Sequence, residues 1–188
     1  MEVTTSVYFP EGGPQHTDET LRLAHARAGA LGIRDIVVAS YTGATGAKAA
    51  RQFKDHNLVV VGGVVGFREP NQTAMRTENQ QLIEDAGARI LFSGHAFGML
   101  GRAAHRRFGA IQIDELIAHV LRLFSQGVKV GCEIACMAAD AGLVQSGAEI
   151  IAIAGSGSGA DTAVVLRASN THTFFDTRVL EIICKPRA

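Results

Sequence analysis

The sequence contains no tryptophan, only three cysteines and four prolines, and no net charge, because 18 basic residues balance 18 acidic ones. A neutral chain lacks the basic surface that general nucleic-acid binding requires, so we expect no nucleic-acid partner. Three cysteines do not make a disulfide framework, which favours a cytoplasmic protein. The longest apolar run, Leu58 to Phe67, is shorter than the ~20 residues needed to cross a bilayer, and we expect neither membrane insertion nor an export signal.

The chain is long enough for one hydrophobic core. Its 188 residues are 47% hydrophobic, which predicts a single domain over residues 1–188. A domain of this size buries about 70% of the surface that its unfolded chain exposes. With nucleic acid and membrane excluded, a small molecule is the expected partner.

Apolar runs, turn residues and helix caps predict alternating strands and helices. The expected strands are Val3–Phe9, Asp35–Ser40, Leu58–Val61, Arg89–Phe92, Glu149–Ala154, Thr162–Ala168 and Val179–Cys184, the last as an edge strand. Val64 and Val65 are expected to extend the third strand through a bulge. The expected helices are one capped by Thr17 and ended by Gly32, then Thr45–Asp55, Thr73–Ala86, Glu115–Ser125 capped by Asp114, and Gly131–Leu143. The basic segment Arg102–Arg107 is interpreted as a solvated loop face in preference to an anion or RNA site.

Four of these strands run into loops of glycine and small polar residues. They end near Ala39, Val61, Phe92 and Ala154, and helices separate them. This order predicts an α/β fold with a mostly parallel sheet covered on both faces. Such sheets bind ligands at the carboxyl ends of their strands, where all four loops would lie.

The segment Ser40 to Ala47, SYTGATGA, has the strand–loop–helix order of a phosphate site. Loop amides and the first amides of the helix would converge on one point, which favours an anion. Ser40, Thr42 and Thr45 can add hydroxyl donors, and Gly43 and Gly46 would let the backbone approach the ligand. The alternative is an ordinary strand-to-helix turn, since the segment is neither a Walker loop nor GxGxxG.

The segment Asp35 to Arg51, DIVVASYTGATGAKAAR, resembles the carboxyl-terminal domain of pyruvate kinase. Together with VGGVVGFREP, SGHA, MAADAG and AGSGSGADTA in the same order, it is similar to a stand-alone, largely archaeal family of pyruvate kinase C-terminal-like proteins of unsettled activity. The resemblance covers about Val7 to Pro186. It implies a three-layer α/β/α fold with at least one antiparallel strand, and flavin mononucleotide (FMN) in the crevice. The resemblance does not extend to the barrel domain of pyruvate kinase, so it implies no kinase active site.

The resemblance also implies a set of ligand-binding residues. Ser40, Thr42, Gly43, Thr45 and Gly46 would hold the phosphate. The glycine-rich loop after Ala154 and the segments 66–68 and 95–97 would line the flavin ring and the ribityl chain. These further residues are Gly155, Ser156, Gly157, Gly159, Asp161, Thr162, Gly66, Phe67, Arg68, His95, Ala96 and Phe97.

Three of these residues have two interpretations each. His95 is either an acid–base or ligand-facing group, and the only catalytic candidate, or a loop histidine bonded to a carbonyl. Arg68 would pair with a phosphate or, preferably, with Glu69 or Glu78. Asp161 is expected to contact the ligand rather than stabilise its own turn.

Two pairs on one predicted helix are expected to be structural. Glu133 and Asp140 share a face, but nothing around them indicates glycosidase or metal chemistry, so a solvated or structural role is favoured. Cys132 and Cys136 lack further ligands at telling spacings and are expected to be small buried side chains. No metal site is therefore expected.

Two functions remain open from the sequence, beside a third interpretation as a scaffold whose glycine-rich loops are only turns. The first is a protein that binds a phosphate-bearing ligand, FMN foremost, with or without flavin-dependent oxidoreductase activity. The second is a non-catalytic regulatory module for a sugar phosphate or nucleotide. The first and last strands could pair within the chain or across a homo-oligomer.

Overall fold

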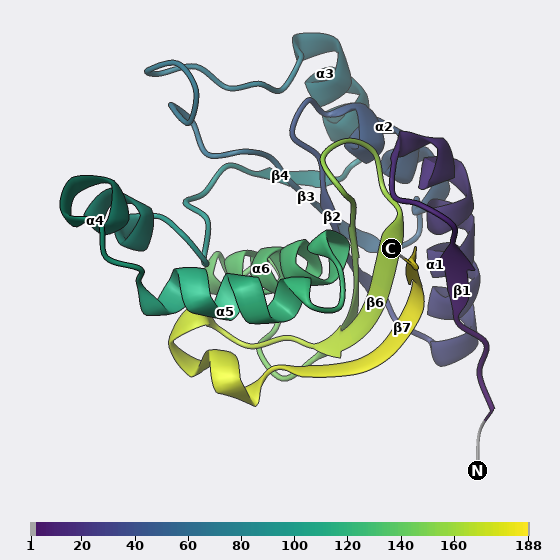
Figure 1. The fold of residues 1–188 in the computed structure, drawn as a ribbon. Coiled ribbons are helices and arrows are strands. Elements are labelled where there is room, and N and C mark those ends of the chain that lie inside the picture. Colours follow the sequence, from purple (N-terminus) through teal and green to yellow (C-terminus); the bar gives the residue numbers. More distant parts are fainter. Residues whose placement is uncertain (1–2, 188) are drawn as a thin grey trace.

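The computed structural model describes residues 3–187, which form an α/β fold around one mixed sheet (Figure 1). The strands are β1 (Val7–Phe9), β2 (Asp35–Ala39), β3 (Asn57–Val61), β4 (Arg89–Leu91), β5 (Glu149–Ala154), β6 (Thr162–Arg167) and β7 (Arg178–Pro186). The helices are α1 (Thr17–Leu31), α2 (Ala44–Gln52), α3 (Thr77–Asp85), α4 (Leu100–Phe108), α5 (Ile113–Arg122) and α6 (Gln126–Asp140). Two 3-10 turns are η1 (Pro14–His16) and η2 (Thr171–Asp176).

The sheet is mostly parallel, with the order β1-β7-β6-β5-β2-β3-β4. β5, β2, β3 and β4 are parallel neighbours, whereas β6 runs antiparallel to both β5 and β7. The predicted parallel core with at least one antiparallel strand is therefore confirmed. The first and last strands pair within the chain, since β1 lies parallel to β7 with Val7 opposite Cys184.

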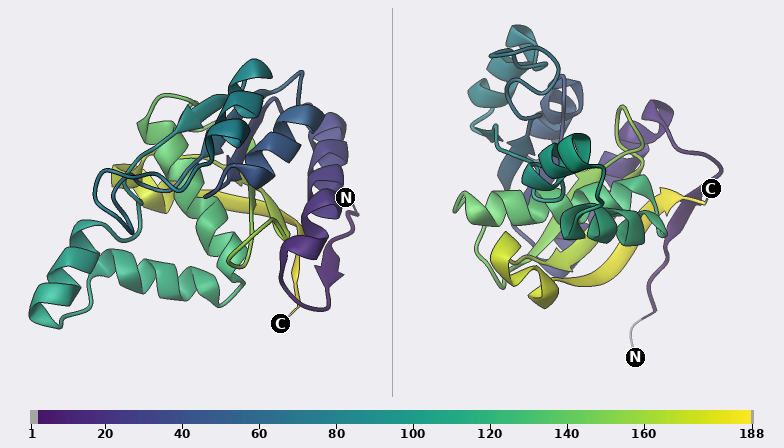
Figure 2. Two further views of the ribbon diagram at one scale, coloured as in Figure 1. Left: turned by 90° about the horizontal axis from the view of Figure 1, so that it is seen from above. Right: turned by 60° about the vertical axis from the view of Figure 1, so that its left-hand side comes forward.

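Helices cover both faces of the sheet. In β2, Ile36 and Val38 face α1, α2 and α3, while Val37 between them faces α5 and α6. This alternation follows from the two-residue period of a strand, and it divides the core into two clusters on either side of the sheet. The structure thus has the three layers that the sequence predicts, as Figure 2 shows from two further directions.

The strand order reverses its direction across the sheet between β2 and β5, which is the topological switch point of the fold. From β2 the chain moves outward through β3 to β4, and it then returns through α4, α5 and α6 to place β5 on the other side of β2. Such a reversal leaves a crevice at the carboxyl ends of the two strands. Within residues 3–187, no helix is both long and apolar enough to cross a membrane.

Several predicted elements are wrong. Val64 and Val65 do not extend β3, because the chain leaves the sheet after Gly62, whose amide still donates to Leu91 O at 2.9 Å. The last strand is not at an edge, because β1 covers it. The segment Arg102–Arg107 is helical and lies in α4, away from the sheet at the left of Figure 1.

Helix starts also differ from their predictions. α1 includes Thr17 as a helical residue because η1 precedes it, and Thr17 Oγ1 donates to Pro14 O at 2.7 Å. Gln112, not Asp114, caps α5, and its amide donates to the Glu115 carboxylate at 3.1 Å. α3 starts four residues later than Thr73 predicts, and α6 starts earlier, where Ser125 Oγ accepts from Val128 N at 3.0 Å.

Candidate functional site

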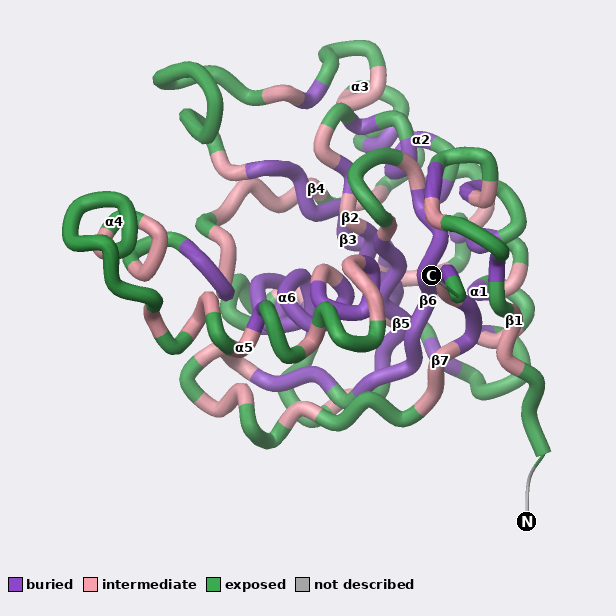
Figure 3. The backbone as a smooth tube through the Cα atoms, viewed as in Figure 1, coloured by how far each residue is buried: buried purple, intermediate pink, exposed green. Residues whose placement is uncertain are grey.

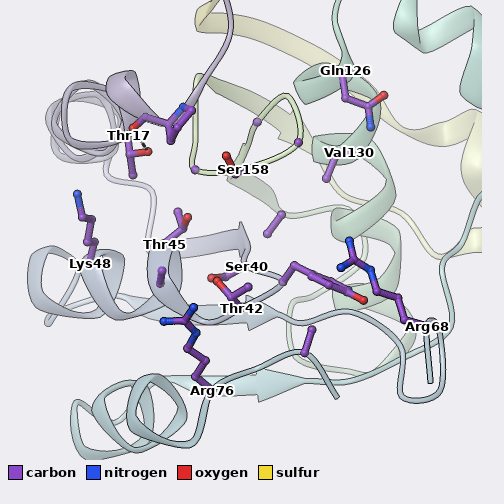
Figure 4. A pocket seen from close by; sticks show the side chains of 18 residues that line it. Thr17, Ser40, Thr42, Thr45, Lys48, Arg68, Arg76, Gln126, Val130 and Ser158 are labelled. Carbon is purple, nitrogen blue, oxygen red and sulfur yellow. Dashed lines mark hydrogen bonds between the residues drawn. The ribbon is translucent and has the colours of Figure 1, made fainter. Parts of the chain in front are cut away.

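A cavity of about 810 Å³ lies at the carboxyl ends of β2 and β5 (Figure 4). It therefore occupies the crevice that the strand order predicts, and its volume is in the range of small-molecule sites. The loops after both strands, the starts of α1, α2 and α6, and the segment before α3 contribute to it. Its lining residues are Pro14, Thr17, Ala39, Ser40, Tyr41, Thr42, Ala44, Thr45, Lys48, Arg68, Ala74, Arg76, Gln126, Val130, Gly155, Gly157, Ser158 and Gly159.

The loop between β2 and α2 is held in place from three sides. Ser40 N donates to Val61 O at 2.9 Å, and Ser40 Oγ accepts from Gly46 N at 2.9 Å. Thr42 O accepts from Arg76 N at 3.2 Å and from Asn79 Nδ2 at 2.9 Å. The loop conformation therefore does not depend on a ligand, and Ser40 uses its hydroxyl as an acceptor within the protein.

The start of α2 presents donors to the cavity. The first amides of a helix have no intrahelical acceptor, and here Gly46 N is used by Ser40 whereas Ala44 and Thr45 line the cavity. The hydroxyls of Thr42 and Thr45 lie beside them in Figure 4. The helix dipole adds positive potential at the same place. Together these groups form an anion cradle.

Three cationic side chains line the cavity, and no carboxylate is among its lining residues. Arg68 lies with Cζ 5.3 Å from the centroid of the Tyr41 ring. Within residues 3–187 it forms no ion pair with Glu69 or Glu78, so the preferred sequence interpretation of Arg68 is wrong. Arg76 lies beside the cradle, and Lys48 Nζ pairs with the exposed Asp18 at 2.7 Å.

The two glycines of the cradle serve packing rather than ligand approach. A Cβ on Gly46 would lie 2.6 Å from Val60 Cγ1, and one on Gly43 would lie 2.6 Å from Asn79 Cβ. Gly43 also has a φ of 86°, which L side chains rarely adopt. Both glycines let α2 approach the sheet and α3 closely, and this places the helix start at the cavity.

Asp161 is a structural residue and does not reach the cavity. It is fully buried, and its Oδ2 accepts from Gly13 N at 2.9 Å and from Ser156 N at 3.1 Å. Its Oδ1 accepts from Thr162 Oγ1 at 2.8 Å. The expectation of a ligand contact is therefore corrected: Asp161 holds the glycine-rich loop against the start of η1, and Gly155, Gly157, Ser158 and Gly159 of that loop line the cavity.

A second, smaller compartment of about 260 Å³ lies on the α6 face of the same crevice. It shares Ala39, Ser40, Tyr41, Gln126 and Val130 with the main cavity. Its other lining residues are Val61, Gly62, Gly63, His95, Arg102, Arg122, Lys129, Glu133, Ile134 and Met137. The structure thus brings His95 to a cavity, although not to the one that contains the cradle.

A buried ion pair lies in this compartment. Lys129 Nζ donates to Glu133 Oε2 at 2.5 Å, and both side chains are almost fully buried. Glu133 Oε1 accepts from Phe97 N at 3.1 Å, so both carboxylate oxygens are used. Burial lowers the pKa of Lys129, and the neighbouring Glu133 opposes that shift. Glu133 is therefore structural but not solvated.

The surroundings of His95 lower the pKa of its imidazole. Burial lowers its pKa from 6.5, the charges of Lys129 and Arg102 act in the same direction, and Glu133 acts against them. Its ring packs edge-on against Phe67, with centroids 5.2 Å apart. Among residues 3–187, no hydrogen-bond partner of its ring nitrogens is found, so the predicted alternative of a carbonyl-bonded histidine is wrong.

The remaining predicted residues lie outside both compartments. Gly66 and Phe67 line a separate hollow of about 190 Å³ with Arg102. Ala96 lines a further surface hollow. Phe97 is buried against Phe174 and lies under the Lys129 ammonium, and Thr162 is buried beside Gly127, where an added Cβ would lie 2.1 Å from Thr162 Oγ1.

Cys132 and Cys136 line neither compartment. Cys132 and Cys136 are buried in α6, as predicted, and burial raises their pKa values to about 12 and about 11. Thiols of such high pKa are weak nucleophiles.

Sequence reasoning missed Tyr41, Arg76 and Lys129. Tyr41 lies within the predicted phosphate segment Ser40–Ala47, and Arg76 lies within the predicted helix Thr73–Ala86. The aromatic ring of Tyr41 and the positive charge of Arg76 were the available signals. Lys129 gives no signal, because an i, i+4 pair with Glu133 is typical of a solvated helix face.

No family model matches the chain. The assignment of a function therefore depends on the geometry of the cavities.

Proposed function

We propose that the protein binds a phosphate-bearing small molecule, FMN foremost, in the main cavity. The observation that carries this proposal is the joint placement of the α2 amides, two threonine hydroxyls and three cations around a cavity without a lining carboxylate. A phosphate is the anion that such a set of donors recognises best.

The residues present fit the parts of FMN. The cradle of Thr42, Ala44 and Thr45 suits the phosphate, and Arg76 lies beside it. The Tyr41 ring and Val130 offer apolar surface for a planar ring. A bound flavin would supply redox chemistry, while the protein orients it and excludes water.

A second candidate function is a regulatory module that binds a sugar phosphate or nucleotide. The hydroxyl of Ser158 and the exposed amides of the glycine-rich loop line the wall opposite the cradle, and they suit sugar hydroxyls as well as a ribityl chain. Both candidate ligands would place a phosphate in the cradle, but only FMN would place a flavin ring against Tyr41 and Val130.

The double variant Thr42→Val/Thr45→Val tests the cradle. Valine matches threonine in shape but removes each hydroxyl, so we expect at least a tenfold loss of affinity for FMN by calorimetry, with unfolding behaviour retained. The control is Thr73→Val, at an exposed threonine next to the lining residue Ala74 that itself lines neither compartment. Equal FMN affinity in the double variant and the wild type would overturn the cradle.

A further inference from the structure

Several hydrogen-bond donors in the second compartment have no acceptor among the residues that the structure describes. Arg102 Nε donates to Gly98 O at 3.1 Å, and Arg122 Nε donates to Gln126 Oε1 at 2.7 Å. Among residues 3–187, no acceptor is found for the terminal guanidinium nitrogens of either side chain. Lys129 has three ammonium donors, of which Glu133 takes one. The compartment can therefore bind further acceptor atoms.

The ionisable side chains that line the compartment carry a net positive charge. Lys129, Arg102 and Arg122 line it against a single carboxylate, Glu133, whose two oxygens are already used. A positive excess in a partly enclosed space favours an anion, because the surrounding dielectric is lower than that of water. The rest of the wall is mixed: Val61, Ile134 and Met137 are apolar, whereas Ser40, His95 and Gln126 are polar.

The geometry favours a carboxylate over a phosphate. The compartment adjoins the flank of α6 and contains no helix start except Gln126 at its border with the main cavity. Its donors are two planar guanidinium groups and one ammonium, and a guanidinium matches a carboxylate with two parallel hydrogen bonds. The volume of about 260 Å³ limits the occupant to a small molecule.

We propose that the second compartment binds the carboxylate of a small organic acid beside the ligand of the main cavity, with Lys129, Arg102 and Arg122 as its anion-binding residues. His95 faces the rest of the acid from the loop after β4. This inference extends the proposed function, since the two compartments share five lining residues, and it names the class of second ligand.

The test is a titration of the whole protein with lactate, followed by NMR of labelled histidine rings. His95 is assigned with the variant His95→Gln, and chloride keeps the ionic strength constant so that screening does not resemble binding. An anion beside His95 stabilises its imidazolium, so lactate should raise its pKa in a saturable way. Lactamide, which has the same shape but no charge, should leave it unchanged.

Matched arginine variants locate the effect. Arg102→Gln and Arg122→Gln should each weaken lactate binding about tenfold, because each removes one charged contact. Arg107→Gln, on the exposed side of α4, should change it less than twofold. These positions lie on the outer helices, so folding is retained; Lys129 is left intact, because removing one partner of a buried pair destabilises the fold.

Each outcome decides the proposal. It is overturned if His95 does not respond to lactate, responds equally to lactamide, or loses its response equally in Arg107→Gln. It is also overturned if inorganic phosphate reproduces the shift and lactate does not. The variant Thr42→Val/Thr45→Val should lose FMN binding and keep the lactate response. A wild-type protein that binds no FMN but still responds to lactate would contradict only the proposed function.

Discussion

The segment of residues 62–125 and the rest of the described chain are built differently. Figure 3 shows most buried backbone in the sheet, α1, α2 and α6, whereas α4, α5 and the loop before α3 are largely exposed. Within residues 62–125 the only buried hydrophobic side chains are Met75, Ile83, Phe97 and Ala118. The rest of the chain therefore supplies most of the core, and this segment supplies a cover over one side of the crevice.

The two compartments reflect this division. The main cavity lies chiefly between β2 and β5, and internal hydrogen bonds of Ser40 and Asp161 fix its loops. The second compartment lies between α6 and residues 62–125, here called the outer segment, which contribute His95 and Arg102. A fixed cradle beside a less tightly packed wall suits a resident ligand beside an exchangeable one, and the following predictions test the contrast.

Truncation of a leucine should give the largest difference between the two regions in the loss of unfolding free energy. Leu166 in β6 is 0% exposed, so Leu166→Ala should lower the free energy of unfolding by about 3 to 4 kcal/mol. Leu123, which follows α5, is 83% exposed, and Leu123→Ala should change it by less than about 0.5 kcal/mol. Urea unfolding measures both, and similar losses would contradict the division.

Removal of an aspartate should show the same contrast. Asp161→Ala leaves three donors without their acceptor, namely Gly13 N, Ser156 N and Thr162 Oγ1, and should cost about 3 kcal/mol. Asp85 in α3 is exposed and accepts only from Gln81, so Asp85→Ala is the matched control with an expected change below about 0.5 kcal/mol. A stable Asp161→Ala protein would show that the glycine-rich loop holds without its carboxylate.

The smallest expected effect is a pH dependence to which both regions contribute. Burial lowers the pKa of His56, near the start of β3, and of His95 in the outer segment from 6.5. The unfolded chain then binds more protons than the native state below pH 6.5, so stability rises with pH through that window and levels off above it. Chemical denaturation between pH 5 and 8 should show this rise. His56→Gln and His95→Gln should each reduce the slope, and an unchanged slope in both would contradict the shifts.

The extent to which sequence predicts structure follows the same division. The strand Glu149–Ala154 is predicted with its observed bounds, because its residues 150–154 are a continuous apolar run that is buried in the structure. Arg102–Arg107 is predicted as a loop but is helical, because an exposed basic helix such as α4 has no apolar stripe in the core to signal it. Hydrophobic pattern thus predicts the buried strand with its bounds but does not reveal α4.

The site shows the same limit. Thr42 and Thr45, which the sequence predicts as phosphate ligands, line the main cavity. The sequence can indicate them because a strand, a loop and a helix start are local features of one segment. Asp161 was misjudged, because the sequence does not show that Gly13 and Ser156 donate to its carboxylate. Lys129 was missed, because the sequence does not show that it lies near His95. Those environments depend on contacts between distant segments.

The most direct test of the main cavity is the absorbance spectrum of the purified protein after incubation with FMN and removal of free ligand, with mass spectrometry of what mild denaturation releases. We expect a yellow protein that releases FMN in a near one-to-one ratio, with that retention lost in Thr42→Val/Thr45→Val. A colourless wild-type protein that retains no FMN would contradict the flavin assignment, and calorimetry with a sugar phosphate would then test the regulatory alternative.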